Sequence, residues 1–577
     1  MQILPGVWMN FMRLLNVKTV WADKYFPFFI VLIHLMSDIK RQVMVKLQPN
    51  MKRDSKKAKT TFRDGEMLCC KLATCQGGIP GAGGLPLALH VLGTFLRGRS
   101  MPEWKDALDK LKKIPDDNIL QILKISYDGL NDEEKTIFLD IACFFREQRK
   151  EEVIQILKNC DLFPTIEINI LMEKALLVEK KDSCGECILE MHDLLQELGR
   201  NIVFQESPSN VGRRSRLWKL EDIHEILKNN TGSEAMQAIV MRPNLHELEV
   251  NPKSFSKMTN LKLLILPWEV KLSYDLKCFP RAIKVVQWYS FPLEALPLQI
   301  PLDKLVDINM HRSKIKQLRN GLLFMQNLKF IDMRGSEDLV ETPDFSGVPN
   351  LEKLILDGCS SLVAVHPSLG ELKKVVEVSL RWCTSLEILP RKLEMNSLMK
   401  LSLFFCCRVF MLPEFVENMK KLSSLNLSHT AITNLPESLG FLIGLRDLNL
   451  SGCNIAGCSK GFKLPKNLND HEALREHDIC EAWSNKRELN VSTWSNLHHI
   501  FEVNLTSLSE LDLSYCCISD DSLPDDFGGL PSLIALDLGY NDFVNMPSGC
   551  FSKLFHLHYL FFLIAKGSSH CQIFHHG

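Results

Sequence analysis

The stretch LEKLILDGC, residues 351–359, is one copy of a pattern that repeats through the second half of the chain. Leucine stands at the first, fourth and sixth positions, and a small or polar residue follows at the ninth. The clear further copies begin at Val375, Leu398, Leu422, Leu445, Leu508 and Leu533, and weaker ones at Leu261, Ile283, Leu305, Leu328 and Leu557. Neighbouring copies mostly start 22 to 25 residues apart, inside the window of about 20–29 residues for leucine-rich repeats. The pattern predicts an α/β leucine-rich-repeat solenoid, a horseshoe, over residues 261–565.

Cysteine fills the ninth position in many copies. In such a repeat each L-x-L is a short parallel strand whose leucines enter a shared core, and the ninth residue turns inward to bond loop backbone. We therefore expect these cysteines to be structural thiols, at Cys359, Cys383, Cys406, Cys453 and Cys516. The 19 cysteines form no compact even-numbered framework, which favours a reducing, intracellular compartment over a disulfide-bonded secreted protein.

Composition excludes several function classes. A chain of 577 residues is too long for one core and suggests roughly three or four units. Its formal net charge of −1 gives no global attraction to nucleic acid or anionic membrane. The apolar run FPFFIVLIHLM, residues 26–36, is shorter than the roughly 20 residues of a membrane-spanning helix. We expect a cytoplasmic protein with no membrane span and no direct nucleic-acid contact.

Some segments stand outside this pattern. Residues 1–65 are aromatic-rich and then basic, with the cluster at Lys52, Arg53, Lys56, Lys57 and Lys59. This cluster is either a solvated or disordered charge run or a nuclear-localisation signal, and the whole segment could be a gene-prediction artefact. Residues 454–504 break the repeat register as an insert, a degenerate repeat or a second such artefact. Residues 231–260 are assigned to a linker, and 566–577 to a tail.

Between residues 80 and 230 the periodicity is helical. LPLALHVLGTFL follows a glycine cluster, and Pro86 suits a first helical turn because its missing N–H costs nothing there. Two helices follow over DDNILQILKISYDGL and DEEKTIFLDIACFF, and then a hairpin with its tip at KDSCGE. Helices followed by a short hairpin are typical of a winged helix. We assign one helical module to residues 80–125 and a winged-helix module to residues 126–230.

Enzyme motifs are weak or missing in this sequence. It contains no G-x-x-x-x-G-K-[ST] phosphate loop. HEALREH, residues 471–477, has Arg475 where a zincin carries its second histidine, and GCSKG, residues 457–461, is followed by a proline-containing run rather than a helix. CGEC, residues 184–187, offers two thiols beside His192, but no second pair lies at zinc-finger spacing. A hairpin tip explains CGEC better, and no catalytic residue is predicted.

MHDLLQELGR, residues 191–200, opens an amphipathic helix with a His-Asp pair. From these residues alone His192 is either a helix-start residue making backbone contacts or a polar group that faces a ligand. Both interpretations stay open at this point.

Four motifs in order are similar to a known family: GGLPLALHVLG, ILKISYDGLNDEEKTIFLDIACFF, MHDLLQELGRNIV and GRRSRLW. Together they resemble the second half of the nucleotide-binding (NB-ARC) region of plant disease-resistance receptors, which leucine-rich repeats follow. FLDIACFF and GRRSRLW resemble the subclass with an N-terminal TIR domain. The resemblance covers about residues 80–565.

The resemblance implies an ADP/ATP-governed switch. It places Pro86 against the adenine and His192 at the ADP β-phosphate, with Asp193 orienting that histidine or locking the local turn. The TIR domain, the phosphate loop and the Walker-B-type aspartates of the family are missing from this sequence. We therefore expect an N-terminally truncated receptor whose nucleotide affinity is weak or absent, with no ATP hydrolysis or NAD cleavage.

Two hypotheses follow. The chain is either a nucleotide-switch immune receptor or an interaction scaffold whose helical half binds no nucleotide. Under both, the concave strand face would contact a pathogen effector or a guarded host protein, and other receptors of this class or TIR-bearing proteins are further candidate partners. Side chains of a strand alternate in direction, so the outward positions are predicted to include Arg334, Asp357, Glu377, Ser379, Arg381, Trp382, Lys400, Ser402, Phe404 and Phe405. The alternative for the aromatic residues is that they tuck between repeats.

Overall fold

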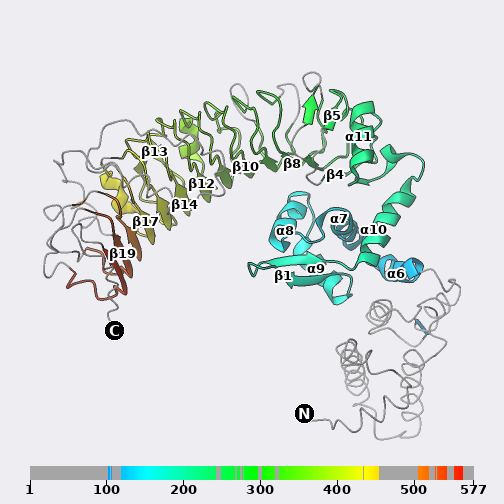
Figure 1. Ribbon diagram of the computed structural model, residues 1–577, viewed down its shortest axis with the longest axis horizontal. Helices are drawn as coiled ribbons and strands as arrows, with labels where there is room; N and C mark the ends of the chain where they lie inside the picture. Colours follow the sequence, from blue (N-terminus) through cyan, green and yellow to red (C-terminus); the bar gives the residue numbers. More distant parts are fainter. Residues whose placement is uncertain are drawn as a thin grey trace, which may run out of the picture. The chain divides into compact units, whose positions relative to one another are not determined.

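The computed structural model divides the chain into two compact units, residues 1–205 and residues 206–577, which are described separately below (Figure 1). The structure describes residues 102, 103, 106, 119–241, 248–266, 270–272, 276, 278–296, 302–318, 324–432, 434–453, 505–516, 518, 527, 529–541 and 551–562. None of the helices in these ranges is both long and apolar enough to cross a membrane.

The first unit is helical with one hairpin. Its described elements are α6 (Ile119–Asp128), α7 (Asp132–Asp140), the π-helix η1 (Ile141–Phe145), α8 (Lys150–Asn159), α9 (Pro164–Glu173), β1 (Val178–Lys181), β2 (Cys187–Glu190) and α10 (Asp193–Glu206). A reciprocal capping box starts α7, because Asn131 Oδ1 accepts from the Glu134 N–H at 2.7 Å and Glu134 returns the bond to the Asn131 N–H. Helices with a β-hairpin are the arrangement predicted for this region.

The FLDIACFF motif forms the core of this unit. Ile137, Phe138, Ile141 and Ala142 have no exposed surface, and α10 packs on them through Gly199. A Cβ at Gly199 would lie 2.5 Å from the Cβ of Ala142. The glycine of the ELGR stretch is therefore required for the close approach of α10 to η1.

The CGEC segment turns the hairpin. β1 and β2 pair antiparallel, with Lys181 opposite Cys187. The carboxylate of Asp182 accepts from the backbone N–H groups of Cys184 and Glu186 at 2.8 and 2.9 Å. An Asx-type turn thus accounts for the tip, and the described residues contain no group of side chains suited to holding a metal ion.

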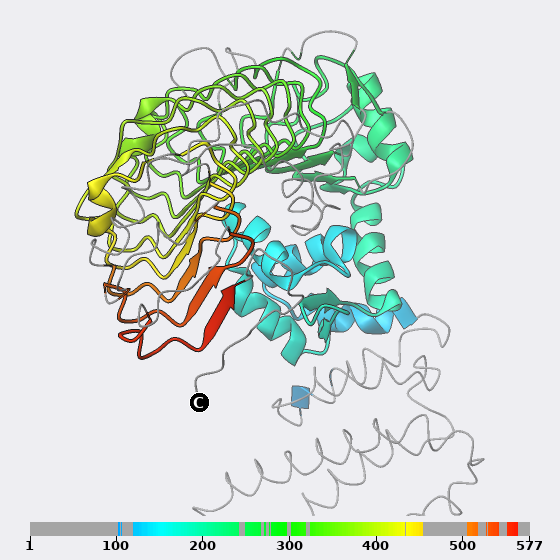
Figure 2. The same cartoon turned by 60° about the vertical axis from the view of Figure 1, so that its left-hand side comes forward.

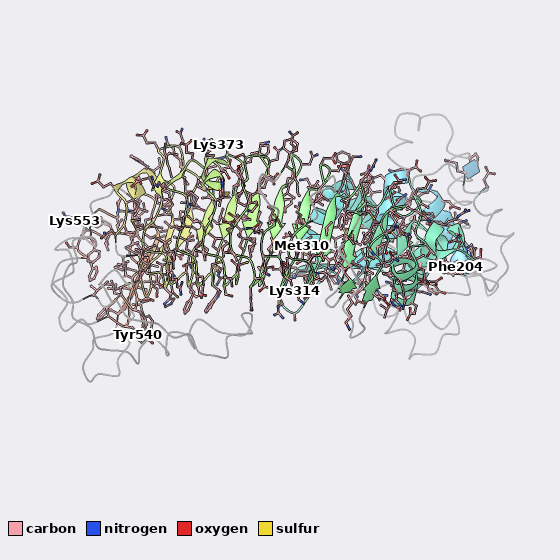
Figure 3. The ribbon with its side chains drawn as sticks, turned by 90° about the horizontal axis from the view of Figure 1, so that it is seen from above. Phe204, Met310, Lys314, Lys373, Tyr540 and Lys553 are labelled. Atoms are coloured by element: carbon pink, nitrogen blue, oxygen red, sulfur yellow. The ribbon has the colours of Figure 1, made fainter. Side chains whose placement is uncertain are left out.

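The second unit is built on a 14-stranded parallel sheet, counted over the described residues. Figure 2 shows its strands following one another along a curve, and Figure 3 shows them from above as a row of short arrows. In chain order the strands are β3 (Arg216–Leu217), β4 (Ala238–Val240), β6 (Leu263–Leu266), β8 (Val285–Trp288), β9 (Asp307–Asn309), β10 (Phe330–Asp332), β11 (Lys353–Ile355), β12 (Glu377–Ser379), β14 (Lys400–Ser402), β16 (Ser424–Asn426), β17 (Asp447–Asn449), β18 (Glu510–Asp512), β19 (Ala535–Leu538) and β20 (Tyr559–Phe562).

Further helical and strand elements lie between these strands in the chain. They are η2 (Val211–Arg213), α11 (Leu220–Asn229), η3 (Pro367–Glu371) and η4 (Glu437–Phe441), with the two-stranded pairs β5 (Leu248–Val250) with β7 (Val270–Leu272) and β13 (Lys392–Leu393) with β15 (Glu414–Phe415).

The solenoid is confirmed, but its start differs from the prediction. β3 and β4 already pair with the sheet. β4 lies in the predicted linker at residues 231–260, and β3 lies in the segment assigned to the winged-helix module, residues 126–230, so the solenoid starts before the predicted boundary at residue 261. These first strands lie in SRLW and QAIVM, which lack the L-x-x-L-x-L spacing. At the other irregularity β17 pairs directly with β18. Residues 454–504 lie outside the described residues, and the ladder is continuous on both sides of them.

The cysteines at the ninth repeat position turn inward as predicted. The thiols of Cys359, Cys383, Cys406, Cys453 and Cys516 donate to carbonyl groups of the preceding repeat at 3.0–3.4 Å. Burial raises the pKa of the Cys453 thiol to about 11, so it stays protonated and can donate. Asn541 takes the same position at the last clear copy, where its Oδ1 accepts from the N–H of Cys516 and of Ile518.

The residue before that position is left-handed in ten repeats, with φ between 53° and 75°: Ser290, Arg312, Gly335, Gly358, Trp382, Phe405, His429, Gly452, Tyr515 and Tyr540. In all of these except Tyr540, the N–H donates to a carbonyl of the next described repeat, for example Trp382 to Phe404 at 2.7 Å and His429 to Ser451 at 2.8 Å. A left-handed conformation costs a non-glycine residue roughly 1–2 kcal/mol. Aromatic stacking along the ladder offsets part of this cost, with ring centroids 4.2 Å apart for Trp382 and Phe405.

Gly452 provides the space for the ring of His429. A Cβ at residue 452 would lie 2.3 Å from His429 Nδ1, whereas a Cβ at Gly335 would meet only the Cγ of the flexible Arg312 side chain at 3.1 Å. We expect Gly335→Ala to lower the unfolding free energy by roughly 1–2 kcal/mol, and Gly452→Ala to cost about 1–3 kcal/mol more through overpacking. Urea unfolding of the two variants beside the wild type measures the difference, and equal midpoints for the variants would contradict the assigned clash.

Candidate functional site

His192 lies between the end of β2 and the start of α10, and its side chain is exposed. Its Nδ1 accepts from the N–H of Leu194 at 3.2 Å, and its carbonyl accepts from the N–H groups of Leu195 and Gln196. Because Nδ1 is the acceptor, the neutral ring must carry its proton on Nε2. His192 therefore caps the helix through one ring nitrogen, and the other is left as a donor.

Arg146 connects the residues on both sides of His192. Its Nε lies 3.0 Å from Glu190 Oε1, and its Nη1 lies 2.5 Å from Asp193 Oδ1 and 2.9 Å from Gln196 Oε1. The Arg146 guanidinium holds the pKa of the Asp193 carboxyl below its ordinary value. This ion pair fits the alternative in which Asp193 fixes the local turn.

Pro86 and Arg146 differ in how the prediction can be assessed: Pro86 was predicted but is not described, and Arg146 is described but was not predicted. Pro86 lies outside the described residues, so the adenine contact predicted for it stays a prediction. Sequence reasoning missed Arg146, although it directly follows the FLDIACFF motif. A lone arginine after a buried motif carries no charge pattern of its own, and its three partners lie 44 to 50 residues away.

The polar residues predicted for the concave face lie on β10–β14 or directly after these strands. Several of them pair with one another or with a neighbour. Glu377 binds Lys353 at 2.7 Å, and Arg334 binds Asp332 at 2.7 Å. Asp357 accepts from the hydroxyl of Ser379 and from the N–H of Arg381, and burial raises its pKa. Arg381, Lys400 and Arg334 are exposed, while Ser402 is half-buried.

The expectation of exposed aromatic anchors was wrong. Trp382, Phe404 and Phe405 are 8, 4 and 1% exposed, so the alternative that they tuck between repeats is correct. The backbone turns left-handed at Trp382 and Phe405, and the alternation that predicted outward side chains does not continue past the strand end. Of this group Arg381 is exposed, with its guanidinium 5.1 Å from the ring centroid of Phe404.

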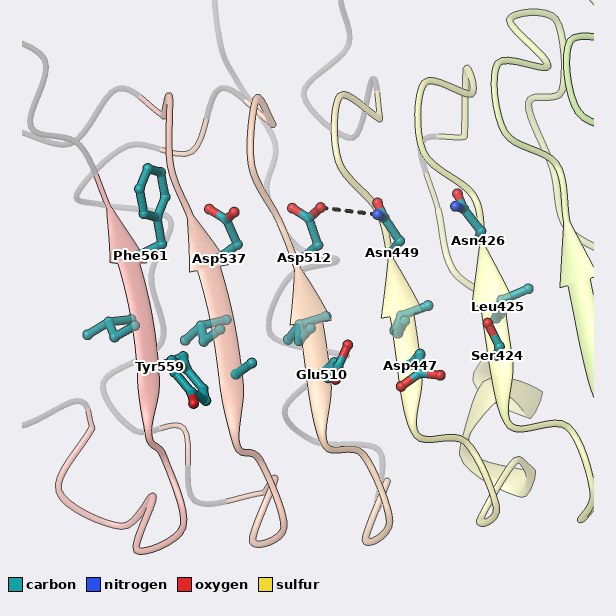
Figure 4. A pocket seen from close by; sticks show the side chains of 15 residues that line it. Ser424, Leu425, Asn426, Asp447, Asn449, Glu510, Asp512, Asp537, Tyr559 and Phe561 are labelled. Atoms are coloured by element: carbon teal, nitrogen blue, oxygen red, sulfur yellow. Dashed lines mark hydrogen bonds between the residues drawn. The ribbon is translucent and has the colours of Figure 1, made fainter. Parts of the chain in front are cut away.

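A groove of about 550 Å³ lies on the C-terminal part of the same sheet face, across β16–β20 (Figure 4). Four carboxylates face it in two rows. Asp447 and Glu510 stand directly opposite each other on β17 and β18, and Asp512 and Asp537 do so on β18 and β19. No Lys, Arg or His is among the described residues that line the groove. We call this feature the acidic groove.

Burial perturbs the carboxylates of the acidic groove. It raises the pKa of Asp537 to about 6, with a further contribution from the charge of Asp512, although the N–H of Gly539 opposes the shift. Burial also raises the pKa of Asp512, whose carboxylate accepts from Asn449 Nδ2 at 3.1 Å. Sequence reasoning missed the groove because Asn449 and Glu510 are 61 residues apart in the chain. Aligning the outward residues of all copies would have shown adjacent acids.

Comparison with known proteins identifies which proteins this chain is similar to. A family model described as "Disease resistance protein Roq1-like, winged-helix domain" matches residues 131–207, and a leucine-rich-repeat model matches residues 507–530. TMV resistance protein N of Nicotiana glutinosa is 32% identical over 503 residues, which are 81% of this chain and 43% of that protein. The chain is a relative of the plant disease-resistance proteins.

Other disease-resistance proteins match in the same way. RUN1 of Vitis rotundifolia is 36% identical over 50% of this chain and 24% of its own length, and RPP2A of Arabidopsis thaliana is 32% identical over 68% and 29%. The chain thus spans less than half the length of these relatives. His192, Asp193 and Arg146 all lie inside the part that the winged-helix model of the disease-resistance family matches.

Solved structures with leucine-rich repeats are also similar to this chain. A Leptospira interrogans leucine-rich-repeat protein is 16% identical with a TM-score of 0.24, over 60% of this chain and 87% of its own. The functional domain of InlJ from Listeria monocytogenes is 13% identical with a TM-score of 0.30, over 61% and 69%.

The ionised carboxyl of Asp537 is expected to lower the free energy of unfolding at neutral pH. Its pKa is raised in the folded protein, so its contribution to stability is present below about pH 4, the unfolded value, and is lost as pH rises through about 6. We expect Asp537→Asn to raise the unfolding free energy at pH 7 by about 1–2 kcal/mol, a figure reduced because the carboxyl is partly solvent-exposed.

Chemical unfolding of wild type and Asp537→Asn at several pH values tests this expectation, with a gain that shrinks toward pH 4. Asp332→Asn is the matched control on the same row. The pKa of Asp332 is lowered, because its interactions with His311 and Arg334 outweigh its burial, so its removal should destabilise. A loss of stability in Asp537→Asn at pH 7 would disprove the assigned desolvation.

Proposed function

We propose that this chain acts in plant immunity as a receptor whose solenoid recognises a pathogen effector or a guarded host protein, while its winged-helix module senses ADP or ATP. The observation that carries the proposal is the 32% identity to TMV resistance protein N across 81% of the chain. Contacts with other receptors of this class or with TIR-bearing proteins, and a cytoplasmic location, belong to the same proposal, which includes no catalysis.

The geometry of the His192 corner supports nucleotide sensing. With Nδ1 engaged by Leu194, the ring presents Nε2 as its donor, and a neutral or protonated imidazole can donate to a phosphate oxygen. Arg146 binds Glu190 before His192 and Asp193 after it, so the backbone that carries the Nε2 donor is held on both sides. An exposed donor on a fixed backbone is suited to contact the ADP β-phosphate.

A nucleotide-free scaffold is the second candidate. The observation in its favour is that His192 already caps α10, which accounts for the residue without any ligand. Under this alternative the solenoid still binds a protein partner, and the winged-helix module is purely structural.

ADP binding by the purified chain separates the two candidates. We expect weak binding of added ADP, and we expect both His192→Ala and His192→Asn to weaken it roughly tenfold further through loss of one charge-assisted bond. Asparagine is a good helix cap, so His192→Asn should keep the wild-type thermal stability while His192→Ala loses some of it. Equilibrium titration with labelled ADP gives the result.

A wild-type chain that binds no ADP would leave the scaffold as the better account. Equal ADP affinity in the wild type and both variants would exclude His192 as the phosphate contact, whatever the role of the winged-helix module. Retention of ADP in His192→Asn but not in His192→Ala would assign the histidine to helix capping alone.

Arg381 and Trp382 separate recognition from folding. We expect Arg381→Glu to abolish restriction of a pathogen isolate that the wild-type chain restricts in leaves, with little change in unfolding midpoint, because its side chain is exposed. Trp382→Ala should lower the unfolding free energy by about 3–5 kcal/mol, since its ring is buried against Phe404 and Phe405. An unfolded Arg381→Glu variant, or one with full recognition, would contradict this division.

A further inference from the structure

On β10–β12, which precede the strands of the acidic groove, the acidic side chains on the outward rows are paired with basic ones. Glu377 on β12 is paired with Lys353 on β11. Asp332 on β10 lies 2.7 Å from Arg334 and 2.9 Å from Nε2 of His311. The outward rows of β10–β12 therefore carry acids together with nearby bases.

The acidic groove differs from these strands. Its two rows place like charges directly opposite one another, Asp447 with Glu510 and Asp512 with Asp537, an arrangement that disfavours folding. The described residues that line the groove include no cation. An uncompensated arrangement that costs stability is typical of a surface kept for binding.

Aromatic side chains close one end of the groove. Tyr559 and Phe561 stand on β20 in the same two outward rows as the acids, and Tyr559 is 56% exposed. An aromatic face beside a carboxylate favours a guanidinium, which can pair with the acid and lie over the ring. At the other end Ser424 and Asn426 on β16 offer neutral hydrogen-bonding groups.

The spread of the carboxylates selects among cationic ligands. Neighbouring strands lie about 4.8 Å apart, so four acids on three strands are distributed over a wider area than the ligands of one metal ion. No group of three or more metal-binding side chains occurs among the described residues. The groove volume of about 550 Å³ accommodates several side chains. Nucleic acids and anionic membranes are repelled by its charge.

We propose that the acidic groove binds an arginine- and lysine-rich segment of the partner protein. The proposal rests on the proposed function, in which the solenoid recognises a protein, and it names the chemistry of that partner. Cationic side chains of the segment neutralise the two acidic rows, and an arginine lies over Tyr559 at the C-terminal end.

Peptide binding to the full chain tests the proposal. The probes are three labelled synthetic peptides of equal length, measured by fluorescence anisotropy: one is arginine-rich, one has lysine in place of every arginine, and one has glutamate in place of every arginine. The groove variant is Asp512→Asn with Asp537→Asn. The matched control is Glu352→Gln with Glu387→Gln, two solvent-accessible acids outside the groove that are paired with Lys329 and Arg408. Burial raises the pKa of both groove carboxyls, so we expect the groove variant to be at least as stable as the wild type, and urea unfolding of both variants checks that lost binding does not come from a weaker fold.

We expect the arginine-rich peptide to bind and the glutamate peptide not to bind. The groove variant should weaken binding at least about tenfold, because its carboxylates contact the peptide directly. The control should weaken binding less than about twofold, because its acids act on the peptide only through solvent, where salt screens their charge. Tyr559→Leu should weaken the arginine peptide more than a lysine peptide. The proposal would be overturned by equal losses of binding in the groove variant and the control, or by equal binding of the arginine-rich and the glutamate peptide. Absence of binding at low salt, or displacement of the arginine-rich peptide by Ca²⁺ alone, would also overturn it.

Pathogen restriction in leaves separates failure of this inference from failure of the proposed function. A wild-type chain that restricts no pathogen counts against the receptor role itself. A groove variant that restricts the pathogen as well as the wild type counts only against the groove as the recognition site.

Discussion

The backbone hydrogen bond at the end of each strand is the constraint on which the solenoid depends. The N–H of the left-handed residue reaches a carbonyl of the next repeat, as from Gly335 to Asp357 and from Gly452 to Ser514 at 2.7–2.8 Å. The bond fixes the pairing of each strand with the next, and the inward thiols fix the turn that follows. Equivalent positions of successive repeats thereby become straight rows across the sheet. A row has chemical properties that no single repeat has, and the acidic groove is the clearest example.

The same constraint determines which side chains are available for binding. At the left-handed position glycine satisfies the backbone at no cost, whereas at Trp382, Phe405 and His429 the contacts between neighbouring rings offset part of the strain. Burial lowers the pKa of the His429 ring to about 4, so it is neutral at physiological pH and belongs to the core. The large aromatic residues thus stabilise the middle of the solenoid. The partner surface proposed above therefore consists mainly of polar and charged side chains, with aromatic side chains only at β20.

The sequence was sufficient for everything that follows from period and spacing. The repeat predicted the solenoid and the inward cysteines, and the order of helices and hairpin predicted the winged helix, because these depend on local patterns. It failed where geometry departs from the regular element. Trp382 and Phe405 were placed outward by strand alternation, which ends where φ becomes positive. Glu510 and Asp447 are neighbours only in space, and β4 lacks the leucine spacing of later repeats. Arg146 was missed for the same reason, since its role is defined by distant partners.

Helix capping and ligand contact, which the sequence presented as alternatives for His192, are compatible in the structure. The capping bond uses only Nδ1, and by doing so it selects the tautomer in which Nε2 carries the proton. A residue such as asparagine could cap the helix equally well, so capping alone gives no reason for an imidazole. Arg146 adds a second requirement, because it ties both Glu190 and Asp193 to the end of the π-helix that follows α7. A movement of that helix would therefore carry the His192 donor with it. Nucleotide contact and the packing of FLDIACFF would then be parts of one equilibrium.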